Sequence, residues 1–198
     1  MTRGTHQVGA FAAALGALAF LEPVASSDAL RPILGLVGIS PAAPPVSWAS
    51  LAAFFVGALF GGTAPDLDKP RKFWARALAH TAFGGHRHLS HSLAGLILAS
   101  GLIGAILGQI GPPIGVAPAL PFLGFVAGYV SHLVLDTLTI EGVPWLFPLP
   151  VYIGLPPWSH LRIRTGTLAE QFLVMPGLLA LIGWIGYHAG STLIDWWR

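Results

Sequence analysis

The segment SHLVLDTLT, residues 131–139, carries a histidine and an aspartate that together could hold a metal ion. His132 and Asp136 are four residues apart, so on a helix their side chains leave the same face, one turn apart. An ionisable residue in a spanning helix is costly to insert and indicates a functional site. The pair therefore predicts a metal site. The alternative is a hydrogen-bonded pair that ends a helix near the membrane interface.

Two aspartates lie close together in PDLDKP, residues 65–70. Asp66 and Asp68 are held between Pro65 and Pro70, so the loop could direct both carboxylates at one cation, or one carboxylate at each of two. The alternative is an acidic turn whose charge is balanced by the basic residues that follow it, Lys69, Arg71 and Lys72.

Three histidines and an arginine gather in HRHLSHS, residues 86–92. If a helix begins near His88, then His88 and His91 share one face, while His86 lies in the approach to that helix. Neutral imidazole is the commonest metal ligand in proteins, and Arg87 is suited to clamp a phosphate or a carboxylate. The segment predicts metal binding or catalysis. A basic collar that contacts anionic lipid headgroups is the alternative.

The composition determines the class of protein that holds these residues. Hydrophobic residues make up 54% of the 198 and charged residues only 9%, whereas a soluble domain carries about 25% charged residues. Ten lysines and arginines are too few for a nucleic-acid surface, so no nucleic-acid partner is expected. The absence of cysteine excludes disulfides and thiolate metal ligands. We expect one integral membrane domain over residues 1–198.

Apolar runs of spanning length predict an all-α, polytopic bundle of about five transmembrane helices. A further short run, residues 30–39, lies between prolines and glycines and is expected to form an interfacial or re-entrant segment. The first run could also be read as a signal peptide. We expect the first two runs to extend into their flanks. The five runs are Val8–Leu21, Ser47–Gly62, Ser92–Ile110, Ala117–Leu138 and Phe172–Gly190.

The basic residues predict the orientation of these spans. With five spans, eight lysines and arginines fall on one side of the membrane and two on the other, so the positive-inside rule places the N-terminus in the cytoplasm. The candidate site residues then all fall on that cytoplasmic face. They come from segments that are far apart in the sequence, as one site would require: His6, Asp66, Asp68, His86, His91, His132, Asp136 and Glu170.

Together these motifs resemble the YdjM-like family, small bacterial membrane proteins described as LexA-regulated, membrane-bound, metal-dependent hydrolases. The resemblance covers residues 5–170 and places the protein in the bacterial inner membrane, as a multi-pass protein. The segments that carry it, in order, are TH (5–6), PDLD (65–68), HRHLSHS (86–92), SHLVLDTLTIEGVPWLFP (131–148) and TGTLAE (165–170).

The resemblance implies a metal-ligand set and a chemistry. The implied ligands are His6, Asp66, Asp68, His86, His91, His132, Asp136 and Glu170, a set that is also similar to that of zinc-dependent phospholipases C. Arg87, His88 and Asp136 are the candidate catalytic residues. His88 stands where the family often has a small residue, so its role as ligand, acid–base group or bystander stays open.

Eight nitrogen and oxygen ligands exceed what one tetrahedral metal needs, so two or more divalent metals are expected. Zinc is the first choice, with manganese or iron(II) as alternatives. The expected function is metal-dependent hydrolysis of a phosphoester by a metal-activated water, with Arg87 stabilising the phosphate charge. The substrate would be a lipid or isoprenoid phosphate, reached among membrane lipids. The alternatives are a metal or proton transporter and an inactive membrane scaffold with a structural metal site.

Overall fold

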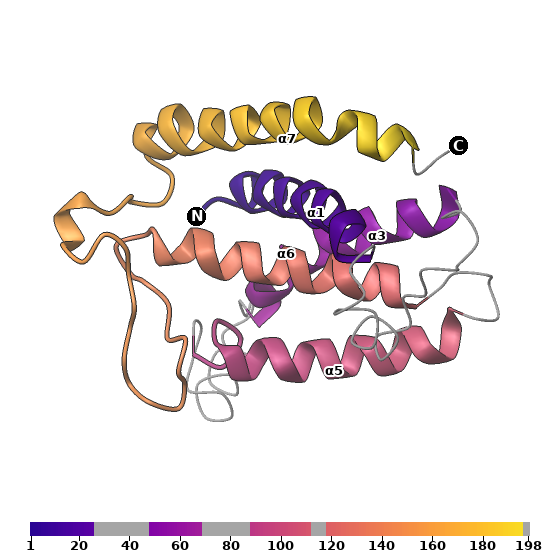
Figure 1. The fold of residues 1–198 in the computed structure, drawn as a ribbon. Helices are drawn as coiled ribbons and strands as arrows, with labels where there is room; N and C mark the ends of the chain where they lie inside the picture. Colours follow the sequence, from indigo (N-terminus) through magenta and orange to yellow (C-terminus); the bar gives the residue numbers. More distant parts are fainter. Residues whose placement is uncertain (26–47, 69–87, 112–117, 196–198) are drawn as a thin grey trace.

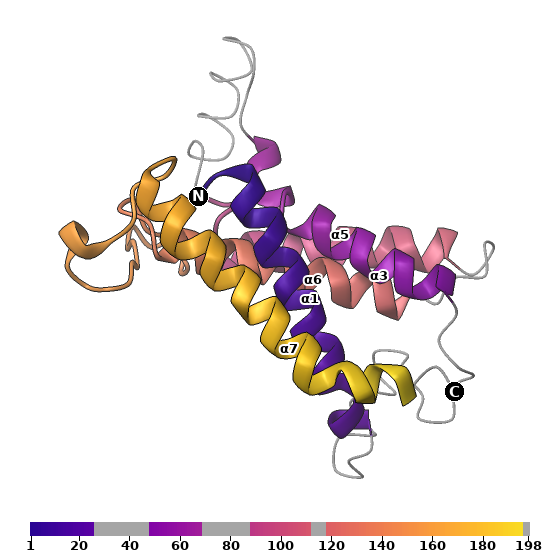
Figure 2. The ribbon, with the colours of Figure 1, turned by 90° about the horizontal axis from the view of Figure 1, so that it is seen from above.

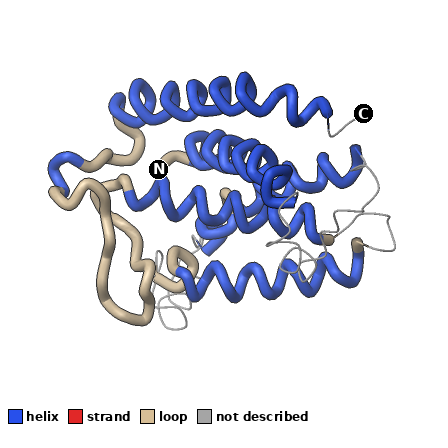
Figure 3. Tube along the Cα trace, viewed as in Figure 1, coloured by secondary structure: helices blue, strands red, loops and turns tan. Residues whose placement is uncertain are grey.

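A computed structural model describes residues 1–25, 48–68, 88–111 and 118–195 of the chain. Within these ranges the chain is helical and contains no β-strand, only two isolated β-bridges, which confirms the all-α prediction (Figure 3). The elements in chain order are α1 (Arg3–Ala25), α3 (Trp48–Gly61), η1 (Ala64–Asp68), α5 (Leu93–Ile110), α6 (Ala119–Thr137), η3 (Ser159–Leu161), η4 (Glu170–Val174) and α7 (Met175–Asp195).

Helix α6 lies at the centre of the bundle and packs against α1, α3 and α5 (Figure 1). Helix α7 packs against α1, and this pair runs obliquely across the layer formed by α3, α5 and α6 (Figure 2). Half of the apolar stretch of α6 is buried inside the bundle, whereas only 6% of the apolar stretch of α5, and of that ending in α7, is buried. Consequently α5 and α7 present apolar surface outward, as helices that face lipid do.

Among the residues that the structure describes, three helices are long and apolar enough to cross a membrane: Leu93–Ile110, Ala119–Thr137 and the continuous helical stretch Glu170–His188. Helix α3 is apolar but has 14 residues, and it ends at Gly61 instead of extending into its C-terminal flank. Helix α1 does extend beyond its apolar run at both ends. The count of five spans and the cytoplasmic face stay predictions, and the run at residues 30–39 lies outside the described residues.

Helix α5 begins at Leu93, whereas a shared helical face for His88 and His91 would need a helix that begins near His88. Ser92 has an extended backbone, and its Oγ accepts a hydrogen bond from the Gly95 amide at 3.1 Å, which makes it the N-cap. His88 and His91 therefore precede the helix, and the expectation that they share a helical face is wrong. His91 is fully buried, whereas His88 is partly exposed.

Helix α7 is preceded by one π-helical turn, Glu170–Val174, in which the Met175 amide donates to the Glu170 carbonyl. Pro176 explains the wider turn. A proline inside a helix donates no hydrogen bond, and its ring crowds the carbonyl four residues earlier, here that of Phe172. Single π-turns of this kind are often found at functional sites. This one begins at a buried carboxylate, since Glu170 is 1% exposed.

Glycines allow α3 and α6 to pack backbone to backbone. A Cβ atom at Gly124 would lie 2.0 Å from the Phe54 carbonyl oxygen, and a Cβ at Gly128 would lie 2.0 Å from that of Ala58. On the other helix, a Cβ at Gly61 would lie 2.0 Å from the Phe125 carbonyl oxygen. Small residues are the usual means by which membrane helices approach this closely. The contact brings the end of α3 beside the last two turns of α6.

Residues 138–169, the α6–α7 loop, form an ordered structure at one end of the bundle (Figure 1). Val143 and Ile153 exchange two backbone hydrogen bonds, and Ile163 bonds back to Leu138. Trp145 fixes the loop to the helices: its Nε1 donates to Thr137 Oγ1 at 2.9 Å, and its carbonyl accepts from the first amide of α5. The starts of α1 and α5 and the end of α6 lie at this same end (Figure 1).

Candidate metal centre

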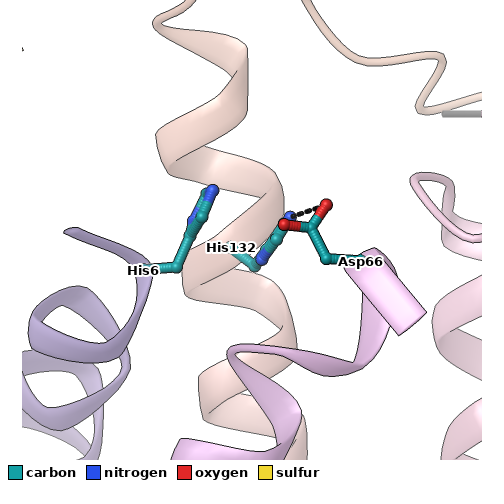
Figure 4. A group of neighbouring side chains, drawn as sticks. All are labelled: His6, Asp66 and His132. Atoms are coloured by element: carbon teal, nitrogen blue, oxygen red, sulfur yellow. Dashed lines mark ion pairs between the residues drawn. The ribbon is translucent and has the colours of Figure 1, made fainter. Parts of the chain in front are cut away.

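Side chains from α1, η1, α6 and the segment before α5 converge at the end of the bundle beside the α6–α7 loop. Figure 4 shows three of them, His6 from α1, Asp66 from η1 and His132 from α6, directed toward one another. Two overlapping groups have ligand atoms close enough to share a cation: His6, Asp66 and His132, and then His91, His132 and Asp136. The structure therefore brings together the predicted ligands from four separate segments.

The backbone fixes the orientation of His132. Its Nδ1 lies 2.8 Å from the Gly62 carbonyl oxygen, which can only accept, so Nδ1 carries the proton and Nε2 offers a lone pair. Metal-bound histidines almost always show this arrangement. The Nδ1 of His91 is likewise engaged, by Ser90 Oγ at 3.0 Å, and its Nε2 faces the Nε2 of His132 at 3.3 Å. Both rings thus present Nε2 to the same point.

Two carboxylates lie close to the point that both Nε2 atoms face. Asp66 Oδ1 lies 3.6 Å from His91 Nε2 and 3.9 Å from His132 Nε2, and Asp136 Oδ2 lies 3.6 Å from each nitrogen. A tetrahedral metal with ligand distances of about 2.0–2.2 Å separates its ligands by about 3.3–3.6 Å. These separations match those edges to within a few tenths of an ångström. His91, His132 and Asp136 thus form one candidate cation site, which we call the first position, and the Asp66 carboxylate lies beside its two histidines.

The other oxygen of Asp136 marks a second position. Its Oδ1 accepts a hydrogen bond from the Met1 amino group and lies 3.2 Å from His6 Nε2. The His6 ring stacks on that of His132, with centroids 3.6 Å apart and planes inclined by 9°. The Met1 amino group is held at this point by Asp136, so a cation would bind here in place of that amino group. Asp136 can therefore bridge two cations, one on each oxygen.

The centre is buried apart from one side. His91 and His132 are 0% exposed and His6 and Asp136 1%, whereas the Asp66 side chain is 21% exposed. Ionisable groups are rarely buried unless they are paired or bind metal. The Nδ1 of His6 is buried without a hydrogen-bond partner in the described part of the chain. Asp66 therefore lines the solvent-exposed side of the centre.

The remaining predicted site residues fall into three groups. His86 and Arg87 lie outside the described residues, as does the side chain of Asp68, the last residue of η1, so their roles stay predictions. His88 lies beside the α6–α7 loop, where its Nε2 is 3.3 Å from the Tyr152 hydroxyl. Glu170 is buried and accepts hydrogen bonds from Thr2, Thr5 and Gly166.

Several contributors to the centre were not found from the sequence. The Gly62 carbonyl orients His132, but a backbone carbonyl has no signature in the residue types. Ser90 and Thr5 stand next to predicted ligands in SH and TH, and a hydroxyl residue beside a buried histidine is the one local signal that could have indicated them. Thr137 has no such signal, since its contact to Trp145 depends on the loop.

Comparisons with known proteins agree with the motifs. The chain is 33% identical over 117 residues to inner membrane protein YdjM of Escherichia coli strain K12, with 56% of each chain covered, and equally to that of Shigella flexneri. It is 31% identical over 108 residues to uncharacterized protein YvsG of Bacillus subtilis strain 168, covering 54% of this chain and 59% of that protein. The matches thus span little more than half the length of these relatives.

No solved structure matches the chain. The model of the family described as YdjM inner membrane protein matches residues 1–192, nearly the whole sequence. It therefore includes all the segments that form the centre. This chain belongs to the YdjM family of inner membrane proteins.

Proposed function

We propose that the protein is a membrane-bound, metal-dependent hydrolase that acts on a phosphoester of a lipid or another membrane-associated substrate. The observation that carries the proposal is the group His91, His132 and Asp136, whose ligand atoms lie close enough to hold one cation, with Asp66 Oδ1 3.6 Å from His91 Nε2. The candidate ligands are nitrogen and oxygen donors and the chain has no cysteine, which suits zinc first and manganese or iron(II) next.

The two positions differ in how many protein ligands they have. The first position has ligand atoms from His91, His132 and Asp136, with Asp66 beside them, so a tetrahedral cation there would take most or all of its ligands from the protein, as in structural sites. The second has Asp136 Oδ1 and His6 Nε2, and a cation there would displace the Met1 amino group, so it would keep places for water and a substrate oxygen. A bound metal supplies Lewis acidity and lowers the pKa of water. The difference supports a bridged pair in which the second position is the reactive one.

The protein's own residues have separable roles in this proposal. Asp136 holds the two positions together, and the Gly62 carbonyl keeps the Nε2 lone pair of His132 directed at the first. Asp66, at the exposed side, borders the path of the substrate. Arg87 is proposed to bind the phosphate charge, because a guanidinium forms paired hydrogen bonds to phosphate oxygens. His88, beside Tyr152, is proposed as an acid–base group.

Asp66→Asn tests the proposal, with purified protein in lipid nanodiscs. The wild type is expected to carry about two equivalents of metal, measured by mass spectrometry, and to hydrolyse at least one member of a panel of phospholipids, lipid phosphates and nitrophenyl phosphates. Asp66→Asn is expected to lower both metal content and turnover, because it removes a charged donor at 3.6 Å from His91. Wild-type protein with less than about one equivalent would contradict the proposal.

His188→Ala is the matched control. His188 is exposed on α7, beside the Trp184 and Tyr187 rings and outside the two ligand groups. The variant removes a histidine and should retain metal and turnover. Metal retention by the wild type without turnover of any substrate would favour the inactive scaffold instead. Metal-dependent flux across a sealed vesicle without hydrolysis would favour the transporter.

A further inference from the structure

The outer surface of the α6–α7 loop is apolar to an unusual degree for a loop. Trp158 is 63% exposed and Leu149 56%, and apolar side chains of similar exposure occur along its length: Leu146, Val151, Tyr152, Leu155, Leu161 and Leu168. A connecting segment in water normally carries polar residues on its surface. Contiguous exposed apolar surface marks an interaction site.

This apolar surface is held in place by a buttressed backbone. The Arg162 guanidinium donates to three carbonyl oxygens of the loop, those of Ile140, Pro156 and Pro157. The Leu155 amide also bonds to the Thr137 carbonyl at the end of α6. These bonds satisfy backbone polar groups of the loop within the protein, as is needed in a segment whose apolar side chains enter a lipid interface.

The loop surface continues the lipid-facing surface of the bundle. The π-helical turn η4, directly after the loop, exposes Phe172 and Leu173 to 70% and 69%. Helix α5, whose first amide bonds to Trp145, exposes Ile97 to 69%. The loop itself contains Trp145, Tyr152 and Trp158, residue types that concentrate at the membrane–water boundary. The exposed Arg164 adds positive charge for anionic headgroups.

We propose that the α6–α7 loop docks into the boundary between headgroups and acyl chains, and that the bilayer surface is its partner. The loop contacts the end of α6 that carries Asp136, because Trp145 Nε1 donates to the Thr137 hydroxyl. Docking therefore places this end of the bundle, and the centre with it, near headgroup depth. The proposal concerns membrane contact alone and holds whether or not the centre is hydrolytic.

Spin labelling tests the docking directly, since the chain has no cysteine of its own. Leu155→Cys carries a nitroxide, and the labelled protein is placed in vesicles of phosphatidylethanolamine and phosphatidylglycerol. Ile97→Cys on α5 is the lipid-exposed control, and Thr165→Cys, an exposed polar position of the same loop, is the aqueous control. Power saturation compares collisions with oxygen, which enriches in lipid, and with a water-soluble nickel chelate.

The label at Leu155 is expected to behave like that at Ile97, with more oxygen than nickel collisions. Nickel collisions at the level of Thr165 would place the loop in water and overturn the proposal. Low accessibility to both reagents would also overturn it, because the surface would then be covered by protein and not by lipid.

A second inference rests on the hydrogen bonds of Glu170. Oε1 accepts from the Thr2 amide at 2.6 Å, the Thr2 hydroxyl at 2.9 Å and the Thr5 hydroxyl at 2.5 Å, and Oε2 accepts from the Gly166 amide at 2.7 Å. An ionised carboxylate has about four lone-pair sites, two on each oxygen, so these donors fill Oε1 and leave one site on Oε2. Within the described chain, Glu170 belongs to neither of the groups that could hold a cation.

The donors to Glu170 lie in the turn that carries a ligand of the centre. Thr2 and Thr5 belong to the start of α1, and His6 follows Thr5 directly, with its Nε2 at Asp136 Oδ1. We infer that Glu170 is a positioning residue that clamps the first turn of α1 and thereby orients His6, in place of the ligand role that the resemblance implies. The inference rests on the proposed pair of cation positions, because Glu170 would support the second position by orienting His6.

Replacing Thr5 separates positioning from ligation. Thr5→Val removes the hydroxyl at nearly constant shape, and Thr5→Ser keeps it. If Glu170 positions His6, Thr5→Val is expected to lose about one of about two metal equivalents, and the d–d spectrum of cobalt-loaded protein should change. Thr5→Ser should restore both readouts.

Thr5→Val with full metal content and an unchanged cobalt spectrum would overturn the positioning role. A wild type that binds no metal would instead refute the proposed function, so the two failures are distinguishable. Glu170→Gln provides a second readout, since its amide nitrogen cannot accept from the Gly166 amide. It should resemble Thr5→Val and remain without effect on the first position.

Discussion

Asp136→Asn is expected to empty both cation positions. One oxygen of Asp136 lies 3.6 Å from the Nε2 atoms of His91 and His132, and the other lies 3.2 Å from His6 Nε2. The neutral amide loses both the charge and one oxygen donor. The loss of metal affinity should therefore exceed the roughly 10–100-fold loss that follows removal of a hydrogen-bond partner of a ligand. Metal content after dialysis against a weak chelator gives the measurement.

Single-ligand variants show whether Asp136 bridges two positions. His6→Ala should remove only the second position and keep about one equivalent of metal. His132→Ala should remove the first, because its Nε2 has no substitute in the described centre. If His6→Ala and Asp136→Asn both retain the wild-type metal content, the bridge is wrong. His188→Ala again controls for the loss of a histidine.

Gly128→Val is expected to be strongly destabilising. A Cβ atom at this position would lie 2.0 Å from the Ala58 carbonyl oxygen and 2.8 Å from the Gly62 nitrogen. Both neighbours are backbone atoms, so no side chain can rotate away, and α3 must separate from α6. Overpacking in a close-packed core costs about 1–3 kcal/mol, and a rigid backbone contact belongs at the upper end. The midpoint of thermal unfolding in detergent should fall accordingly.

The same substitution should weaken metal binding from a distance. The Gly62 carbonyl holds His132 Nδ1 at 2.8 Å, and separation of the two helices lengthens that hydrogen bond. Loss of a histidine's outer partner lowers metal affinity by about 10–100-fold. Gly101→Val is the matched control, because a Cβ at Gly101 on α5 meets nothing within 4 Å. Equal unfolding midpoints for the two variants would show that the α3–α6 contact is not tight.

The sequence predicted the helices well and their ends less well. Apolar runs gave the spans of α5 and α6 to within two residues, because an apolar helix must satisfy its backbone hydrogen bonds within itself. Local chemistry decided the ends: the Ser92 cap starts α5 after the histidines. Pro176 widened the first turn of the last helix. The apolar pattern alone predicts neither the cap nor the widened turn.

The candidate centre was predictable because the chain is poor in ionisable residues. Five ionisable residues stand at the ends of apolar segments: His6, Asp66, His91, His132 and Asp136. An unpaired charge at such a position is costly to place in a membrane, so these residues indicate a functional site. The structure brought these five together. It gave Glu170 a different environment, with hydrogen bonds to Thr2 and Thr5, because sequence spacing does not tell a ligand from a carboxylate that holds a turn.

The sequence by itself determined the class of protein, the helical segments and the types of donor atom available, since composition and periodicity act through local energetics. The tertiary structure alone decided which donors meet. Backbone contact through Gly61 and Gly128 places the Gly62 carbonyl at His132, and the Asp136 carboxylate divides its oxygens between two positions. Ligand spacing of a few ångströms depends on long-range packing of helices, and that information is distributed over the whole bundle.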